Sequence, residues 1–93
     1  MKQFEFESHQ IRVDSFRMIN LPDVSKAFDQ PWSQAIKLLD DELVVATEEA
    51  LCKRVTPPYR FHGESVWAHP LIAWKFAELM DVSKGCRFAI RIL

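Results

Sequence analysis

The sequence is short of glycine and has no long apolar run, and each shortage narrows what this 93-residue chain can be. It contains two glycines and five prolines, too few for a disordered or low-complexity chain. No apolar run approaches the roughly 18 residues that a membrane-spanning helix needs. The first residues alternate apolar and acidic side chains, which is not the pattern of a signal peptide. We therefore expect a cytoplasmic protein without a membrane partner.

Cysteine is also scarce. Cys52 and Cys86 lie far apart in the sequence and form no Cys-x-x-Cys pattern. We expect both to be buried or half-buried thiols, because free cysteine is among the most buried residue types. The alternative is a zinc site made by both cysteines with His62 and His69, although this spacing matches no compact zinc motif. We expect no cofactor and no metal.

Net charge is almost absent, at −1, which is not typical of a nucleic-acid-binding protein. The distribution is uneven, however. Residues 1–52 carry five basic and ten acidic side chains, whereas residues 53–93 carry seven basic and three acidic ones. The nearly neutral total therefore allows a basic face, provided that the basic residues of the second half gather on one surface.

What the chain has in quantity is apolar material. Hydrophobic residues make up 48% of it, with seven Phe and three Trp, enough for one compact core and a single domain over residues 1–93. Residues 3–7 and 11–13 alternate with the period of a β-strand and predict a hairpin, and residues 16–19 predict a third strand. Asn20 is a favourable cap for a helix over residues 21–28.

The remaining elements are predicted by capping and turn residues. Pro31 favours a helix over residues 31–39, and Asp40 or Asp41 can cap a helix over residues 42–55. Two β-prone runs, 59–61 and 65–67, flank His62-Gly63-Glu64 and predict a second hairpin. His69-Pro70 starts a helix that reaches Met80, with His69 as its cap or as a packing residue and Trp67 as a core anchor beside it. Ser83 is expected to cap a last helix, whose first turn Gly85 weakens.

No arrangement of residues supports catalysis. The chain has no glycine-rich phosphate loop, no nucleophile motif and no acid cluster with metal-binding spacing. We expect that it is not an enzyme.

Two segments resemble a known family. They are "IRVDSFRMINLPDVSKAF" (11–28) and "VWAHPLIAWKFAELM" (66–80), and the second is similar to the Trp-x-His-Pro motif and Ala-rich helix of the KilA-N family. These are DNA-binding domains of phages, large DNA viruses and bacteria, related to the APSES domains of fungi. The resemblance implies a small α+β, winged-helix-like domain with an N-terminal β-hairpin, a wing hairpin and four to five helices. It also implies double-stranded DNA as partner and a phage or prophage regulatory role.

The resemblance implies a short recognition helix over residues 31–39 and a wing over residues 59–67. In such a domain the recognition helix enters the major groove, and cations near the wing meet phosphates. The candidate DNA-binding residues are polar side chains of the recognition helix (Ser33, Gln34 and Lys37) and side chains that surround the wing (Lys53, Arg54, Arg60 and His62). Lys84, Arg87 and Arg91 are candidates to extend the surface. For the helix residues, the alternative is an ordinary solvated helix face.

A different class of function fits the same sequence. The acidic first half, with Asp40, Asp41 and Glu42 beside the candidate recognition helix, favours a protein-interaction module that keeps the fold and binds a host or phage protein. A homodimer that completes its binding surface by symmetry is a further alternative.

Overall fold

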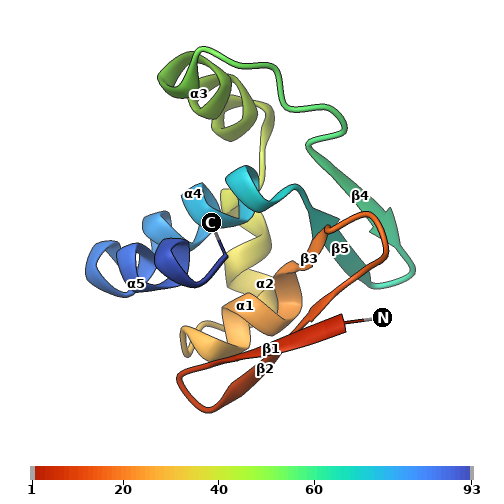
Figure 1. Cartoon of the computed structure of the whole chain (residues 1–93), viewed down its shortest axis with the longest axis vertical. Coiled ribbons are helices and arrows are strands. Elements are labelled where there is room, and N and C mark those ends of the chain that lie inside the picture. Colours follow the sequence, from red (N-terminus) through yellow and green to blue (C-terminus); the bar gives the residue numbers. More distant parts are fainter. Residues whose placement is uncertain (1, 93) are drawn as a thin grey trace.

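The computed structural model describes residues 2–92, which form a five-stranded antiparallel sheet and five α-helices (Figure 1). The α+β class predicted from the sequence is confirmed. The strands are β1 (Lys2–Phe6), β2 (His9–Val13), β3 (Ile19–Asn20), β4 (Tyr59–His62) and β5 (Ser65–Ala68). Their order in the sheet is β1-β2-β3-β5-β4. Both predicted hairpins are confirmed, and the third strand begins later than expected.

The helices follow the capping residues closely. They are α1 (Leu21–Ala27), α2 (Trp32–Ala35), the 3-10 helix η1 (Ile36–Leu38), α3 (Asp41–Leu51), α4 (Pro70–Met80) and α5 (Val82–Ile92). The predicted caps of three of them are confirmed, because Asn20, Asp40 and His69 each accept a hydrogen bond from a backbone N–H in the first turn of α1, α3 and α4. Figure 1 shows α3 at the opposite end of the molecule from the β1–β2 hairpin.

The predicted helix over residues 31–39 is wrong as a continuous α-helix. Its first turn is α-helical, but Ile36–Leu38 tightens into a 3-10 turn and Leu39 is extended. Pro31 at the start makes no side-chain capping bond. A run this short gains little from helix propagation, so packing of Ala35 and Leu38 on the core decides its shape.

Two further helix boundaries differ from the prediction. The α3 helix ends at Leu51 rather than near residue 55, because Cys52 adopts a left-handed conformation with φ 50°. The chain then turns back and buries Val55, whose N–H donates to Glu48 Oε2 at 2.8 Å. The cap of α5 is Asp81 and not Ser83, since Asp81 Oδ1 accepts from the N–H of Lys84 at 3.0 Å. One residue therefore separates α4 from α5.

The core joins the N-terminal hairpin to the last helix. Phe88 of α5 is fully buried and lies within 5.2 Å of Phe6 and 5.9 Å of Phe28, measured between ring centroids. Phe76 of α4 is also fully buried. Aromatic rings from β1, the end of α1 and α5 thus fasten the two ends of the chain together.

The β4–β5 hairpin, which we call the edge hairpin, grows out of this core. Its inner strand β5 pairs with β3, with Ala68 opposite Ile19 and Trp67 opposite Asn20. Trp67 is 9% exposed, as expected of a core anchor. Only the base of the hairpin is held in this way, because Ser65 and Val66 pair with β4 alone. The outer strand β4 forms one edge of the sheet.

Replacing Asn20 with alanine is expected to lower the free energy of unfolding by about 1–2 kcal/mol. The side chain is fully buried, and its Oδ1 accepts from the N–H of Asp23 at 3.0 Å. Urea unfolding measures the loss. Asn20→Ser leaves a similar volume empty but keeps a capping oxygen, so an equal loss in both variants would show that the cap contributes nothing.

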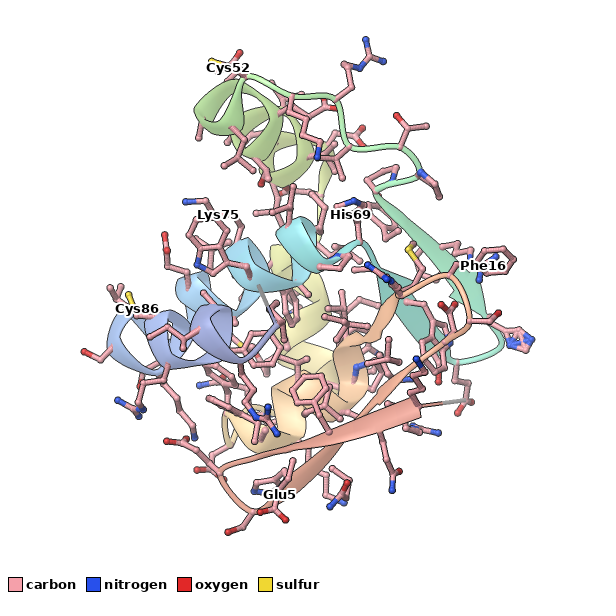
Figure 2. The ribbon with its side chains drawn as sticks, viewed as in Figure 1. Glu5, Phe16, Cys52, His69, Lys75 and Cys86 are labelled. Carbon is pink, nitrogen blue, oxygen red and sulfur yellow. The ribbon has the colours of Figure 1, made fainter. Side chains whose placement is uncertain are left out.

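The expectation of buried cysteines is wrong, because Cys52 and Cys86 are both exposed. Cys52 lies beyond the last turn of α3 and Cys86 on the outer face of α5, well separated in Figure 2. Among residues 2–92 no three His, Cys, Asp or Glu side chains lie close enough to hold a metal ion, so the zinc alternative fails there.

Within the same residues, no helix combines the length and apolar composition needed to span a bilayer.

Candidate nucleic-acid interface

The three candidate residues of the broken helix face solvent. Ser33 and Gln34 lie on α2 and Lys37 on η1, and all three side chains are exposed while Ala35 between them is buried. They therefore share a short polar face. This face is about two turns long. None of its three residues lines the depressions around the loop between β2 and β3.

The four candidates near the second hairpin divide into two groups. Arg60 and His62 are exposed on β4, the outer strand of the edge hairpin. Lys53 and Arg54 lie in the link between α3 and β4. The Arg54 side chain is 88% exposed, and its guanidinium lies 3.5 Å from Glu48 Oε2. Such an exposed pair contributes little to stability, so the Arg54 side chain is mobile enough to change partner.

The loop between β2 and β3 is built around one aspartate. Asp14 Oδ1 accepts hydrogen bonds from the N–H groups of Phe16, at 2.8 Å, and Met18, at 2.9 Å. The loop closes further with the N–H of Arg17 donating to the carbonyl of Asp14 at 3.0 Å. Arg17 adopts a left-handed conformation with φ 66°, and its side chain is exposed. Hydrogen bonds to one carboxylate thus fix the place of Arg17.

The same aspartate connects this loop to the edge hairpin. Arg60 Nη2 donates to Asp14 Oδ2 at 2.7 Å. The Arg60 guanidinium also lies 4.9 Å from the centre of the Phe16 ring, which is 71% exposed. Figure 2 shows Phe16 at the outer margin of the molecule, beside the hairpin. Arg60 is therefore positioned by a charge and a ring before any partner arrives.

Three adjoining depressions around this loop form a continuous basic surface. The first of them shares Val13 and Arg17 with the second and His69 with the third. Five cations line them: Lys2, Arg17, Lys53, Arg60 and Arg91. In the described part of the chain, residues 2–92, Asp14 is the one carboxylate that lines them, which leaves an excess of four positive charges. We call this set of residues, with His69, the basic surface.

Other cations of the second half are paired away from the basic surface. Arg87 and Lys84 both contact Glu7, at 3.0 and 3.2 Å, and Lys84 also donates to the carbonyl of Ala27 at 2.6 Å. These contacts fasten α5 to the β1–β2 turn and the end of α1. Of the three candidates for extending the interface, only Arg91 lies on the basic surface.

His69 lines two of the three depressions and has the predicted capping role. Its Nδ1 accepts the N–H of Leu71 at 3.1 Å, at the start of α4. Burial lowers the pKa of His69, and the positive charge of Lys53 lowers it further. The neutral imidazole with an acceptor at Nδ1 carries its proton on Nε2, so its free nitrogen is a hydrogen-bond donor.

The Asp14 carboxylate predicts a loss of stability in acid. Burial opposes its ionisation, but hydrogen bonds from the N–H of Met18, from Arg60 and from the N–H of Phe16 outweigh burial and lower its pKa. A carboxylate whose pKa is lower in the folded than in the unfolded protein stabilises the fold above the unfolded pKa of about 3.9. This stabilisation is lost as the pH falls through the pKa of the folded state. Between about pH 5 and pH 2, the wild type should lose roughly 1 kcal/mol more than Asp14→Asn in urea unfolding. Parallel losses would show that neither the ion pair with Arg60 nor the backbone hydrogen bonds lower the pKa of Asp14.

Part of the basic surface could be predicted from the sequence. Lys53 and Arg60 were among the candidates and lie on it, whereas Ser33, Gln34, Lys37, Arg54 and His62 do not line it. Arg17 and Lys2 were missed. The signal in the sequence was the loop between two predicted strands. This loop begins with Asp14, and an aspartate side chain can accept hydrogen bonds from backbone N–H groups a few residues later. That signal predicts the turn but not the direction of the Arg17 side chain.

Comparison with protein-family models, with curated proteins and with solved structures finds no match to this chain.

Proposed function

We propose that this protein binds double-stranded DNA and that phosphates bind to the basic surface. The observation that carries the proposal is the excess of four positive charges on three adjoining depressions of a chain whose net charge is −1. Phosphate contacts from Lys and Arg provide most of the affinity in protein–DNA binding. An electrostatic surface gathered against the overall charge is expected of a protein that needs such contacts.

The edge hairpin supports the proposal through its construction. Trp67 and its neighbours on β5 fix its base in the core, while Arg60, Phe61 and His62 are exposed on β4. Side chains carried on a rigid base lose little freedom when they bind. This is the role of a wing in the winged-helix-like fold that the resemblance to KilA-N domains implies, and we propose the same role here, in a phage or prophage regulatory protein.

The broken helix has a secondary place in this proposal. Ser33, Gln34 and Lys37 are exposed, and Gln34 has the amide that pairs with adenine in a major groove. A face of about two turns reaches few base edges, so we assign sequence preference to it and most of the affinity to the basic surface.

Duplex binding at varied salt concentration tests the proposal. Fluorescence anisotropy of a labelled duplex should show saturable binding at about 50 mM salt and a steep loss of affinity towards 200 mM. Three or more phosphate contacts would give a slope of about −2.7 or steeper in a plot of log K against log salt. Absence of binding to any duplex at low salt would disprove it.

A second candidate function is recognition of a protein partner. The specific observation is the free edge of β4, which carries Phe61 with 65% of its surface exposed. An extended segment of another protein can add a strand to such an edge, as many peptide-binding domains allow.

Capture from a host lysate with and without nuclease distinguishes the two functions. A protein partner that remains after nuclease treatment, and that Phe61→Lys releases, would favour strand addition at β4. Partners that all disappear after nuclease treatment would favour DNA.

A further inference from the structure

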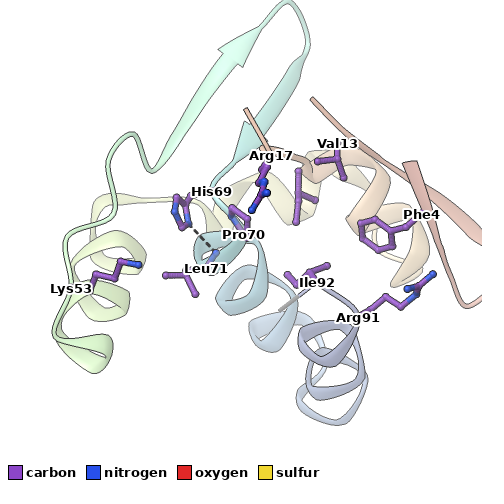
Figure 3. A pocket seen from close by; sticks show the side chains of 10 residues that line it. Phe4, Val13, Arg17, Lys53, His69, Pro70, Leu71, Arg91 and Ile92 are labelled. Carbon is purple, nitrogen blue, oxygen red and sulfur yellow. Dashed lines mark hydrogen bonds between the residues drawn. The ribbon is translucent and has the colours of Figure 1, made fainter. Parts of the chain in front are cut away.

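A pocket beside the start of α4 is lined by basic and apolar side chains. Its volume is about 460 Å³, within the range of small-ligand sites. Figure 3 shows it below the base of the edge hairpin, between α4, α5 and the first two strands. Its walls come from segments far apart in the chain, so the site exists only when the whole fold is formed.

Among residues 2–92, all charged side chains that line this pocket are basic. Arg17 comes from the β2–β3 loop, Lys53 from the link after α3 and Arg91 from α5. Arg17 and Lys53 take part in none of the ion pairs formed among residues 2–92. Arg91 donates from Nε to the backbone carbonyl of Glu5 at 3.1 Å. This acceptor is neutral and does not compensate the positive charge of the guanidinium. These three cations and the Nε2–H of His69 are all donors, which selects a ligand rich in acceptors and negatively charged.

The floor of the pocket is apolar. It is made by five of the lining residues: Phe4, Val13, Ile19, Leu71 and Ile92. In Figure 3 Leu71 and Ile92 lie between Lys53 at one end and Phe4 with Arg91 at the other. A bare phosphate would contact only the basic residues of the pocket and would leave the apolar floor exposed to water. An apolar body with a negative group would use both.

We infer that this pocket binds a small amphiphilic organic anion: an aromatic or aliphatic body on the floor, with a carboxylate, sulfonate or phosphate against Arg17, Lys53 and His69. The inference does not rest on DNA binding, although Arg17 and Lys53 belong to the basic surface. It assigns to this chain a small-molecule site in addition to its proposed macromolecular partner.

Two fluorescent probes that differ in one charged group test the inference. Anilinonaphthalene sulfonate has an apolar body and a sulfonate, and phenyl-naphthylamine has the same body without the charge. We expect the sulfonate to bind the folded protein with a Kd in the micromolar range and at least about fivefold more tightly than the neutral probe. In amide spectra of the labelled protein, the probe should shift Ile19 and Leu71. Equal affinity for both probes, or shifts confined to other residues, would overturn the inference.

Variants of exposed side chains add a second test without disturbing the fold. Arg17→Gln and Lys53→Gln should each raise the Kd of the sulfonate probe about fivefold and leave the neutral probe unchanged. Arg54→Gln is the matched control, because it removes one positive charge next to Lys53 but outside the pocket. If Arg54→Gln weakens the sulfonate as much as Lys53→Gln does, the probe responds to general surface charge and the pocket is not its site. Duplex binding is measured separately, so its absence does not affect this test.

Discussion

Arg60→Gln is expected to weaken duplex binding about tenfold at low salt, whereas Asp14→Asn is expected to strengthen it about threefold. The two residues form one ion pair at 2.7 Å, and both lie on the basic surface. Removing Arg60 loses a phosphate contact and leaves the Asp14 carboxylate facing the DNA. Removing the charge of Asp14 takes away a carboxylate of that surface and releases Arg60 to a phosphate.

The pair of variants provides its own control for stability. Both variants break the same ion pair, so both should lower the free energy of unfolding by a similar and small amount. Asparagine keeps the Oδ1 atom that accepts from the N–H groups of Phe16 and Met18, so the loop that holds Arg17 is preserved. A change of opposite sign in DNA affinity therefore cannot come from loss of the fold.

Fluorescence anisotropy over a range of salt concentrations measures both effects. The slope of log K against log salt should become shallower by about 0.9 in Arg60→Gln, the loss expected for one phosphate contact. If both variants weaken binding equally, the ion pair acts only by shaping the surface. If neither changes it, DNA does not reach the edge hairpin, and the protein-interaction function becomes the better proposal.

The parts of the fold that could be predicted are those that short-range chemistry decides. Asn20, Asp40 and His69 each bond a backbone N–H within three residues, so their helix starts are visible in the sequence. The two hairpins were visible through alternation of apolar and polar residues around a turn. For these elements, local sequence and overall structure agree.

The parts that could not be predicted depend on contacts between distant segments. The helix over residues 31–39 breaks because Ala35 and Leu38 pack on a core that other segments provide. The basic surface needs cations from β1, the β2–β3 loop, residues 53–60 and α5, which only the folded chain brings together. Lys84, predicted as an extension of that surface, instead binds the carbonyl of Ala27, which lies 57 positions away in the sequence. No local pattern shows which of these partners a lysine will find.

Gly85 shows most clearly how local and long-range reasoning can disagree. On helix propensity alone, Gly85 weakens the first turn of α5, and its replacement by alanine should stabilise the protein by about 1 kcal/mol. The structure gives glycine a reason. A Cβ atom at residue 85 would lie 2.7 Å from the Cα and 2.9 Å from the backbone N of Glu78 on α4. Because the neighbour is backbone, no rotamer change can make room.

Gly85→Ala is therefore expected to destabilise the protein by about 2 kcal/mol, the cost of overpacking minus the gain in propensity. To accept the methyl group, α5 must move away from α4, which also loosens Phe88 in the aromatic core. For a domain of this size the loss corresponds to a Tm lower by about 10 °C, measured by circular dichroism. Ser83→Ala, at an exposed position of the same helix, changes propensity alone and should leave the Tm nearly unchanged. A Tm of Gly85→Ala at or above that of the wild type would mean that α4 and α5 do not approach as closely as this structure has them.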